Sequence, residues 1–137
     1  MSSSQRIVCD TNSIVSAMLL PSSVAAKVYA RLCAQAEILT SRATLAELNE
    51  VIARKKFDRY LSQSQRLEFV DLYELASVSI GITHSVTDCR DSKDNKFLEL
   101  AQSGQATLIL TGDDDLLTLH PWGGIAILSP ANYLALT

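Results

Sequence analysis

The sequence predicts a three-layer α/β/α fold with a central parallel sheet of about five strands. Short continuous apolar runs such as Ile7-Val8-Cys9 are typical of strands that are buried on both faces. These runs alternate with longer segments whose apolar residues recur at helical spacing, and this alternation favours parallel strands joined by crossover helices. A length of 137 residues suits one domain, in which we expect residues 1–5 to be flexible.

Turn and capping residues separate the elements in the first half of the chain. Asp10 ends the first strand, and either Asn12 or Ser13 is in position to cap the helix that follows. Pro21 interrupts that helix, and Ser23 is a suitable N-cap for the next one. The expected elements are a strand at 7–9, a helix from 12 or 13 to 18, a helix at 24–34, a strand at 37–40, and helices at 44–55 and 63–76.

The second half continues the alternation with shorter elements. Pro121-Trp122-Gly123-Gly124 turns the chain into its last strand, and Pro130 suits the first turn of a final helix. The expected elements are a strand at 77–82, a helix at 93–103, a strand at 107–111, a short helix at 114–119, a strand at 125–128 and a helix at 130–136.

Composition and charge narrow the functional classes. Hydrophobic residues make up 47% of the chain and charged residues 20%, as in ordinary globular proteins. With no signal-like segment and no apolar run of about 20 residues, we expect a cytoplasmic protein without a membrane span. The 3 cysteines are typical of reduced thiols, and they complete no zinc site with the 2 histidines. The net charge of −3 opposes nucleic-acid binding unless cations neutralise some of the acids.

Two groups of acids follow predicted strands, where the ligand sites of α/β sheets collect. Asp10 directly follows the first strand, and the Asp113-Asp114-Asp115 run follows the strand at 107–111. Asp94 lies on the apolar face of its helix, so its carboxylate would need a cation, a donor or a proton. Glu47 lies at the edge of a buried helical stripe and can reach the same cleft, whereas Glu50 should be solvated.

Each of these acids also has an ordinary structural explanation. Asp91 and Asp94 could begin their helix, where the dipole favours acids, and Thr44 has capping-box spacing from Glu47. A cluster of carboxylates, however, would repel itself unless cations bind, and oxygen ligands favour Mg²⁺ or Mn²⁺. The residues alone therefore leave metal-dependent phosphoryl chemistry and purely structural roles both open.

In four segments the sequence resembles the PIN-domain family, and within it the VapC-like ribonucleases that are toxins of prokaryotic toxin–antitoxin pairs. The matching segments are Ile7-Val8-Cys9-Asp10-Thr11-Asn12, Ala46-Glu47-Leu48, and the segments 91–101 and 110–117. Together they span almost the whole chain. The resemblance implies a parallel sheet flanked by helices, and an acidic site that binds Mg²⁺ or Mn²⁺ and cleaves RNA to leave a 5′-phosphate and a 3′-hydroxyl.

The resemblance also implies roles for individual residues. The first three catalytic and metal-binding acids would be Asp10, Glu47 and Asp94. The fourth falls in the Asp113 to Asp115 run, where Asp113 is favoured over Asp115, and Asp115 would then be a neighbouring metal ligand. Asn12, Thr111 and Asp91 would support the site. The family further implies an antitoxin partner and a homodimer.

A basic segment and an apolar set are candidate contact surfaces. The densest basic patch could bind RNA or could simply be a solvated helix end; it consists of Arg54, Lys55, Lys56 and Arg59. Aromatic and aliphatic side chains could line a partner groove or belong to the core; they are Tyr60, Leu61, Phe69 and Tyr73.

Two other functions stay open. A PIN-like module could bind partners without turnover, as a scaffold. A haloacid-dehalogenase-like phosphatase also has an Asp after its first strand, but it needs a second Asp where this chain has Asn12, and a late Lys, whereas no Lys follows Lys96.

Overall fold

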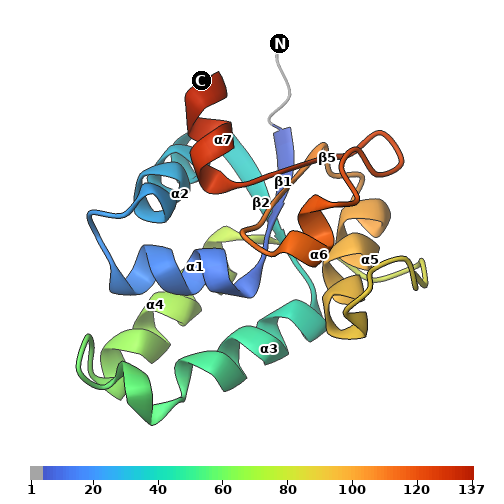
Figure 1. Ribbon diagram of the computed structural model, residues 1–137. Helices are drawn as coiled ribbons and strands as arrows, with labels where there is room; N and C mark the ends of the chain where they lie inside the picture. The colour runs from blue at the N-terminus through green and yellow to red at the C-terminus, as the bar shows by residue number, and fades with distance from the viewer. Residues whose placement is uncertain (1–4) are drawn as a thin grey trace.

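In the computed structural model, which describes residues 5–137, a five-stranded parallel sheet has the order β3-β2-β1-β4-β5 (Figure 1). The strands are β1 Gln5–Cys9, β2 Ala36–Thr40, β3 Val78–Ser79, β4 Leu108–Leu110 and β5 Ala126–Leu128. The central strand β1 pairs with β2 through Ile7 and Ile38, and with β4 through Val8 and Ile109. Its carboxyl end therefore lies beside that of β4.

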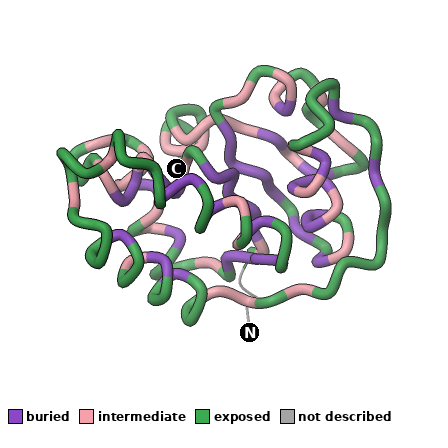
Figure 2. The backbone as a smooth tube through the Cα atoms, turned by 90° about the horizontal axis from the view of Figure 1, so that it is seen from below, coloured by how far each residue is buried: buried purple, intermediate pink, exposed green. Residues whose placement is uncertain are grey.

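Helices cover both faces of the sheet. They are α1 Thr11–Leu19, α2 Val24–Gln35, α3 Arg42–Ile52, α4 Gln63–Ala76, α5 Asn95–Ser103, α6 Asp114–Leu117 and α7 Pro130–Leu136, with 3₁₀ turns η1 Lys55–Phe57 and η2 Ser92–Asp94. Ile7 and Cys9 of β1 face the cluster formed with α1 to α4, whereas Val8 faces the cluster formed with α5 and α6. The buried residues accordingly lie mainly in the middle of the molecule, between the outer helices (Figure 2). The predicted three-layer fold is confirmed.

The third strand is shorter than the predicted 77–82. β3 consists of Val78 and Ser79, which pair with Leu39 and Thr40 of β2. β2 ends at Thr40, so after the bond from Ile80 N to Thr40 O, at 2.8 Å, the edge strand has no further neighbour to pair with. The chain then runs irregularly to η2.

Two helices begin at other residues than the sequence pattern suggests. Asp10 caps α1 by accepting a hydrogen bond from Ser13 N at 2.9 Å, in place of Asn12 or Ser13. In α3 the capping box joins Ser41 and Thr44, so the alternative that pairs Thr44 with Glu47 is wrong. Glu47 therefore lies in the middle of α3 and satisfies no group at the helix terminus.

Two further expectations concern the flexibility of residues 1–5 and the absence of a membrane span. Of the segment 1–5 that was expected to be flexible, Gln5 begins β1, and residues 1–4 lie outside the described residues. Within residues 5–137, no single helix is long and apolar enough to cross a membrane. α1 and α2 pass that test only as a pair, with a bend of 103° between them.

Candidate active site

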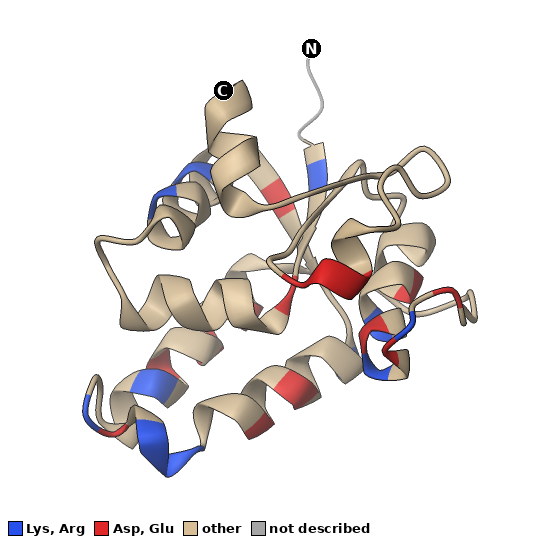
Figure 3. Cartoon of the chain, in the orientation of Figure 1, with Lys and Arg blue, Asp and Glu red and all other residues tan. Residues whose placement is uncertain are grey.

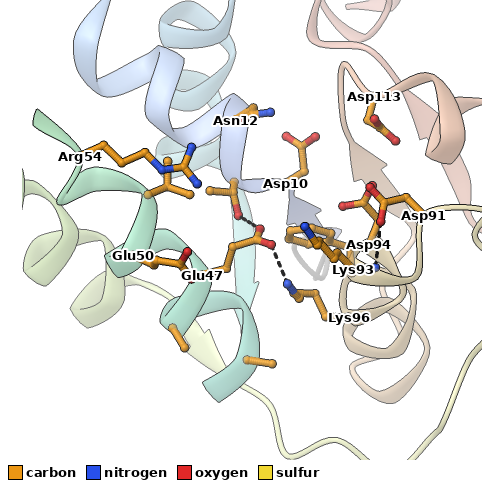
Figure 4. A pocket seen from close by; sticks show the side chains of 15 residues that line it. Asp10, Asn12, Glu47, Glu50, Arg54, Asp91, Lys93, Asp94, Lys96 and Asp113 are labelled. Atoms are coloured by element: carbon orange, nitrogen blue, oxygen red, sulfur yellow. Dashed lines mark hydrogen bonds and ion pairs between the residues drawn. The ribbon is translucent and has the colours of Figure 1, made fainter. Parts of the chain in front are cut away.

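A cleft of about 550 Å³ opens at the carboxyl ends of β1 and β4, between α3 and the start of α5 (Figure 4). Its charged side chains are Asp10, Glu47, Glu50, Arg54, Asp91, Lys93, Asp94, Lys96 and Asp113. The parallel pairing of β1 with β4 explains the convergence, because the first residues after neighbouring strands meet at one edge of the sheet. Asp10 N donates to Leu110 O at 3.0 Å and so continues the ladder into the site.

Asp10 is the most buried acid in the cleft, with 5% of its surface exposed. Both carboxylate oxygens have donors: Ser13 N lies 2.9 Å from Oδ1, and Thr111 Oγ1 lies 2.5 Å from Oδ2. Burial raises the pKa of Asp10, the two donors oppose that shift, and the Asp113 charge adds to it. The carboxylate is thus held in one orientation at the floor of the cleft.

Thr111 links Asp10 to Asp113. Its buried hydroxyl donates to Asp10 and accepts a hydrogen bond from Asp113 N at 2.9 Å. Asp113 in turn caps α6 by accepting from Leu116 N at 3.1 Å. One hydroxyl therefore sets the separation of two acids that come from different strands.

Asp94 is half-buried at the end of η2, facing other carboxylates. Its pKa is raised to about 7, mainly because it is desolvated and then because of the charges of Asp113 and Asp91. A hydrogen bond with Asp113 and the more weakly acting charge of Glu47 raise it further. A proton on Asp94 or a cation beside it would therefore stabilise this side of the cleft near neutral pH.

Glu47 approaches from α3, on the opposite wall of the cleft (Figure 4). Lys96 Nζ donates to Glu47 Oε1 at 2.6 Å, and the Thr11 hydroxyl donates to Oε2. Both oxygens of Glu47 are thus engaged by the protein itself. Glu50 and Arg54 continue this wall toward the end of α3.

The residues expected to support the site separate into two groups. Asn12 and Asp91 line the cleft, and Asp91 also caps η2 by accepting from Lys93 N at 3.1 Å. Asp115 does not line the cleft; its Oδ1 atom lies 3.2 Å from Nε of Arg90. Of the two acids considered for the fourth position, only Asp113 faces the cleft.

Only one residue of the basic segment lies at the cleft. Figure 3 shows one group of cations at the connection between α3 and α4, below the cleft. Arg54 alone of the four lines the cleft. Lys56 lies over the Phe57 ring and Arg59 over the Tyr60 ring, and both are exposed.

Two charged cleft residues escaped the sequence analysis: Lys96 and Lys93. Glu50, which was expected to be solvated, is exposed and also lines the cleft. Lys96 had a detectable signal, since a cation in the first turn of a helix opposes the dipole and needs a partner. Asn95, which the periodicity turns toward solvent, is buried instead, and its Oδ1 atom accepts from Cys89 N at 2.8 Å. The 3₁₀ turn before α5 rotates the first residues of the helix away from the expected faces.

The donor set suits a hard divalent cation in chemistry. Its members are carboxylates and hydroxyls, which Mg²⁺ and Mn²⁺ prefer, and the contact of Asp94 with Asp113 is one that a cation would stabilise. As the side chains stand in residues 5–137, no three acids, histidines or cysteines converge closely enough to enclose an ion. To enclose an ion, the acids of the cleft would have to move closer together.

Comparisons with known proteins agree with this architecture. A profile of the PIN domain matches residues 6–115. An uncharacterized protein of Methanocaldococcus jannaschii is 31% identical over 117 residues, which cover 84% of this chain and 75% of that protein. A chain in the crystal structure of VapBC2 from Rickettsia felis, bound to a DNA fragment from their promoter, has a TM-score of 0.63. The match covers 89% of this chain and 96% of that one at 14% identity, which shows a shared fold.

Proposed function

The chain belongs to the PIN-domain family, and from this premise we propose that it is a metal-dependent endoribonuclease and the toxin of a toxin–antitoxin pair. The observation that carries the proposal is the meeting of Asp10, Asp94 and Asp113 at the ends of β1 and β4. Three carboxylates from separate parts of the chain lie near one another there, and the pKa of Asp94 is raised, first by burial and then by the charges of Asp113 and Asp91. A cluster of acids of this kind favours the binding of a cation, as is typical of functional sites.

When bound, Mg²⁺ or Mn²⁺ would activate water and neutralise charge on the phosphodiester being hydrolysed. Asp10, Asp94 and Asp113 would hold the ion, with Glu47 facing them across the cleft. Thr111 orients Asp10 and, through Asp113 N, the neighbouring acid. Hydrolysis would leave a 5′-phosphate and a 3′-hydroxyl.

Arg54 is the residue best suited to bind RNA phosphate. It lies on the α3 wall, on the opposite side of the cleft from Asp94 and Asp113 (Figure 4). A guanidinium can bind a phosphate through two parallel hydrogen bonds. A strand bound along the cleft would place one phosphate on Arg54 and another near the acids. Lys55, Lys56 and Arg59 would contribute only to the general attraction of the polyanion.

We extend the proposal to the partners. The fold that the chain shares with a VapBC2 chain supports an antitoxin as its partner. We also propose that the protein works in the cytoplasm. An apolar hollow on α2 and α4 is a candidate surface for that antitoxin or for a homodimer; its lining is Tyr29, Phe69, Leu72, Leu75 and Ala76. Leu75 is 83% exposed, whereas Tyr73, which had been considered for such a groove, belongs to the core.

Cleavage of labelled single-stranded RNA of mixed sequence tests the proposed activity. Purified protein would be assayed with Mg²⁺, Mn²⁺ or EDTA, and the product ends would be identified by mass spectrometry. We expect cleavage that requires metal and falls by roughly 100-fold or more in Asp94→Asn, because that change removes a cation ligand. Asp71→Asn, an exposed change on α4, is the matched control and should cleave normally.

Other outcomes would redirect the proposal. Equal cleavage by Asp94→Asn and the parent would mean that the acid cluster is not the active centre. Neither metal binding nor cleavage would favour the non-catalytic PIN-like binding module.

A further inference from the structure

We propose that Lys96 is a positioning residue that takes the place of a second divalent cation, so that the cleft binds a single ion. The fixed ammonium would neutralise Glu47 on the α3 wall, and the ion would bind on the opposite wall, among Asp10, Asp94 and Asp113. The inference rests on the proposed metal-dependent function and specifies which positive charge neutralises the acids on each wall of that site.

The contacts of Glu47 are the first support. Its Oε1 atom lies 2.6 Å from Lys96 Nζ, and each side chain is 23% exposed. A short, charge-assisted and largely sheltered contact of this kind is stronger than a solvent-exposed ion pair. Because the Thr11 hydroxyl donates to Oε2, neither oxygen of Glu47 is left without a donor. A divalent ion at Glu47 would have to share these oxygens with both donors and would lie beside the positive charge of Lys96.

The arrangement of the acids is the second support. Figure 4 shows Asp91, Asp94 and Asp113 on one wall, Glu47 on the other, and the Lys96 ammonium directed at Glu47. Within residues 5–137, no lysine or arginine side chain lies at ion-pair distance from Asp91, Asp94 or Asp113. The uncompensated negative charge therefore lies on the wall of Asp94, where one ion can neutralise it.

The placement of Lys96 in its helix is the third support. It is the second residue of α5, where the helix dipole disfavours a cation. Helix formation therefore does not explain a lysine at this position, whereas the contact with Glu47, which joins α5 to α3, does. Lys93 lines the same cleft but is exposed, and within residues 5–137 no carboxylate lies at ion-pair distance from it.

The number of bound Mn²⁺ ions, measured by calorimetric titration and by the electron paramagnetic resonance of bound Mn²⁺, tests the inference without reference to activity. The parent should bind one ion per chain. Lys96→Met should bind two, because Glu47 loses its fixed cation and its Oε1 atom becomes free to bind an ion. Lys96→Arg, which keeps the charge, and the matched control Lys93→Met should each bind one.

A double variant separates this explanation from a general disturbance of the cleft. Lys96→Met combined with Glu47→Gln should return the number to one, because the second ligand group is removed together with the ammonium. If Lys96→Met does not fold, as judged by circular dichroism, Glu47→Gln decides the matter. We expect it to leave the affinity for the single ion within about 3-fold, whereas Asp94→Asn should weaken it by more than 10-fold.

Failure of the Lys96 inference can be distinguished from failure of the proposed function. Two ions in the parent, one ion in folded Lys96→Met, or a large loss of affinity in Glu47→Gln would overturn the role of Lys96 and leave the nuclease proposal intact. No Mn²⁺ binding by the parent would instead overturn the proposed metal-dependent function, and the inference with it.

Discussion

Thr111 Oγ1 donates a hydrogen bond to Asp10 Oδ2 at 2.5 Å, between residues that are 101 positions apart in the chain. The same oxygen accepts a bond from Asp113 N at 2.9 Å. Thr111 is fully buried, so water cannot replace either bond. The relative position of the two acids therefore depends on this one hydroxyl.

Thr111→Val should weaken both the fold and the metal site. The change leaves a buried carboxylate without one donor and a backbone N–H without an acceptor, and we expect a loss of about 1–3 kcal/mol in the free energy of unfolding. Mn²⁺ affinity should also fall, because Asp10 and Asp113 are no longer held in position by one shared hydroxyl. Urea unfolding and calorimetric titration measure the two effects. Thr111→Ser keeps the hydroxyl and should stay close to the parent; a Thr111→Val variant that is as stable as the parent and binds Mn²⁺ as tightly would contradict this role of the hydroxyl.

The stability of the metal-free protein should fall as the pH rises from 5 to 8. The pKa of Asp94 is raised to about 7 in the folded chain, from an ordinary value of 3.8, and that of Asp10 is raised as well. A group with a raised pKa stabilises the fold below its unfolded value and loses this contribution as the pH passes through its folded value. Urea midpoints measured in EDTA check the trend.

Asp94→Asn is the control for this pH dependence. The variant lacks the group that titrates near 7, so its stability should depend less on pH and should exceed that of the parent at pH 8. A parent that grows more stable between pH 5 and 8, or an unchanged slope in the variant, would contradict this account of the cleft.

Arg54→Gln should lower RNA affinity more than Arg59→Gln does. Both residues are exposed arginines of one basic segment, but only Arg54 lines the cleft. Loss of one phosphate contact should reduce the salt dependence of single-strand binding by about 0.7 in log–log slope. Fluorescence anisotropy at several salt concentrations, in an Asp94→Asn background that prevents cleavage, measures both quantities. Equal effects of the two changes would indicate a diffuse electrostatic surface.

Arg66→Met should destabilise the fold without changing the metal site. The guanidinium is 1% exposed and donates to Ile52 O at 2.7 Å, Leu61 O at 2.5 Å and Asp58 Oδ1 at 2.9 Å. Its loss leaves two carbonyls unpaired, at about 1–3 kcal/mol for each one that stays buried. Urea unfolding measures the cost. Arg42→Met, an exposed change on α3, should stay within about 0.5 kcal/mol of the parent.

The sequence by itself determined the alternation of strands and helices and the placement of two acid groups behind strands. α4 and α7 have the predicted bounds, because Ser62 and Ser129 cap them and their apolar spacing is local. Asp10 and Asp113 follow β1 and β4 as expected, since a buried apolar run followed by a polar turn is also a local signal.

Only the tertiary structure decided where the edge strand ends and which groups lie beside the acids of the cleft. β3 ends where β2 ends, the Thr111 hydroxyl orients Asp10 across 101 positions, and Lys96 meets Glu47 across 49 positions. Each outcome depends on atoms that are distant in sequence: a strand edge, a buried hydroxyl or a carboxylate from another helix. Local periodicity carries no information about such partners, because the energy of a buried charge is set by whatever the folded chain brings next to it.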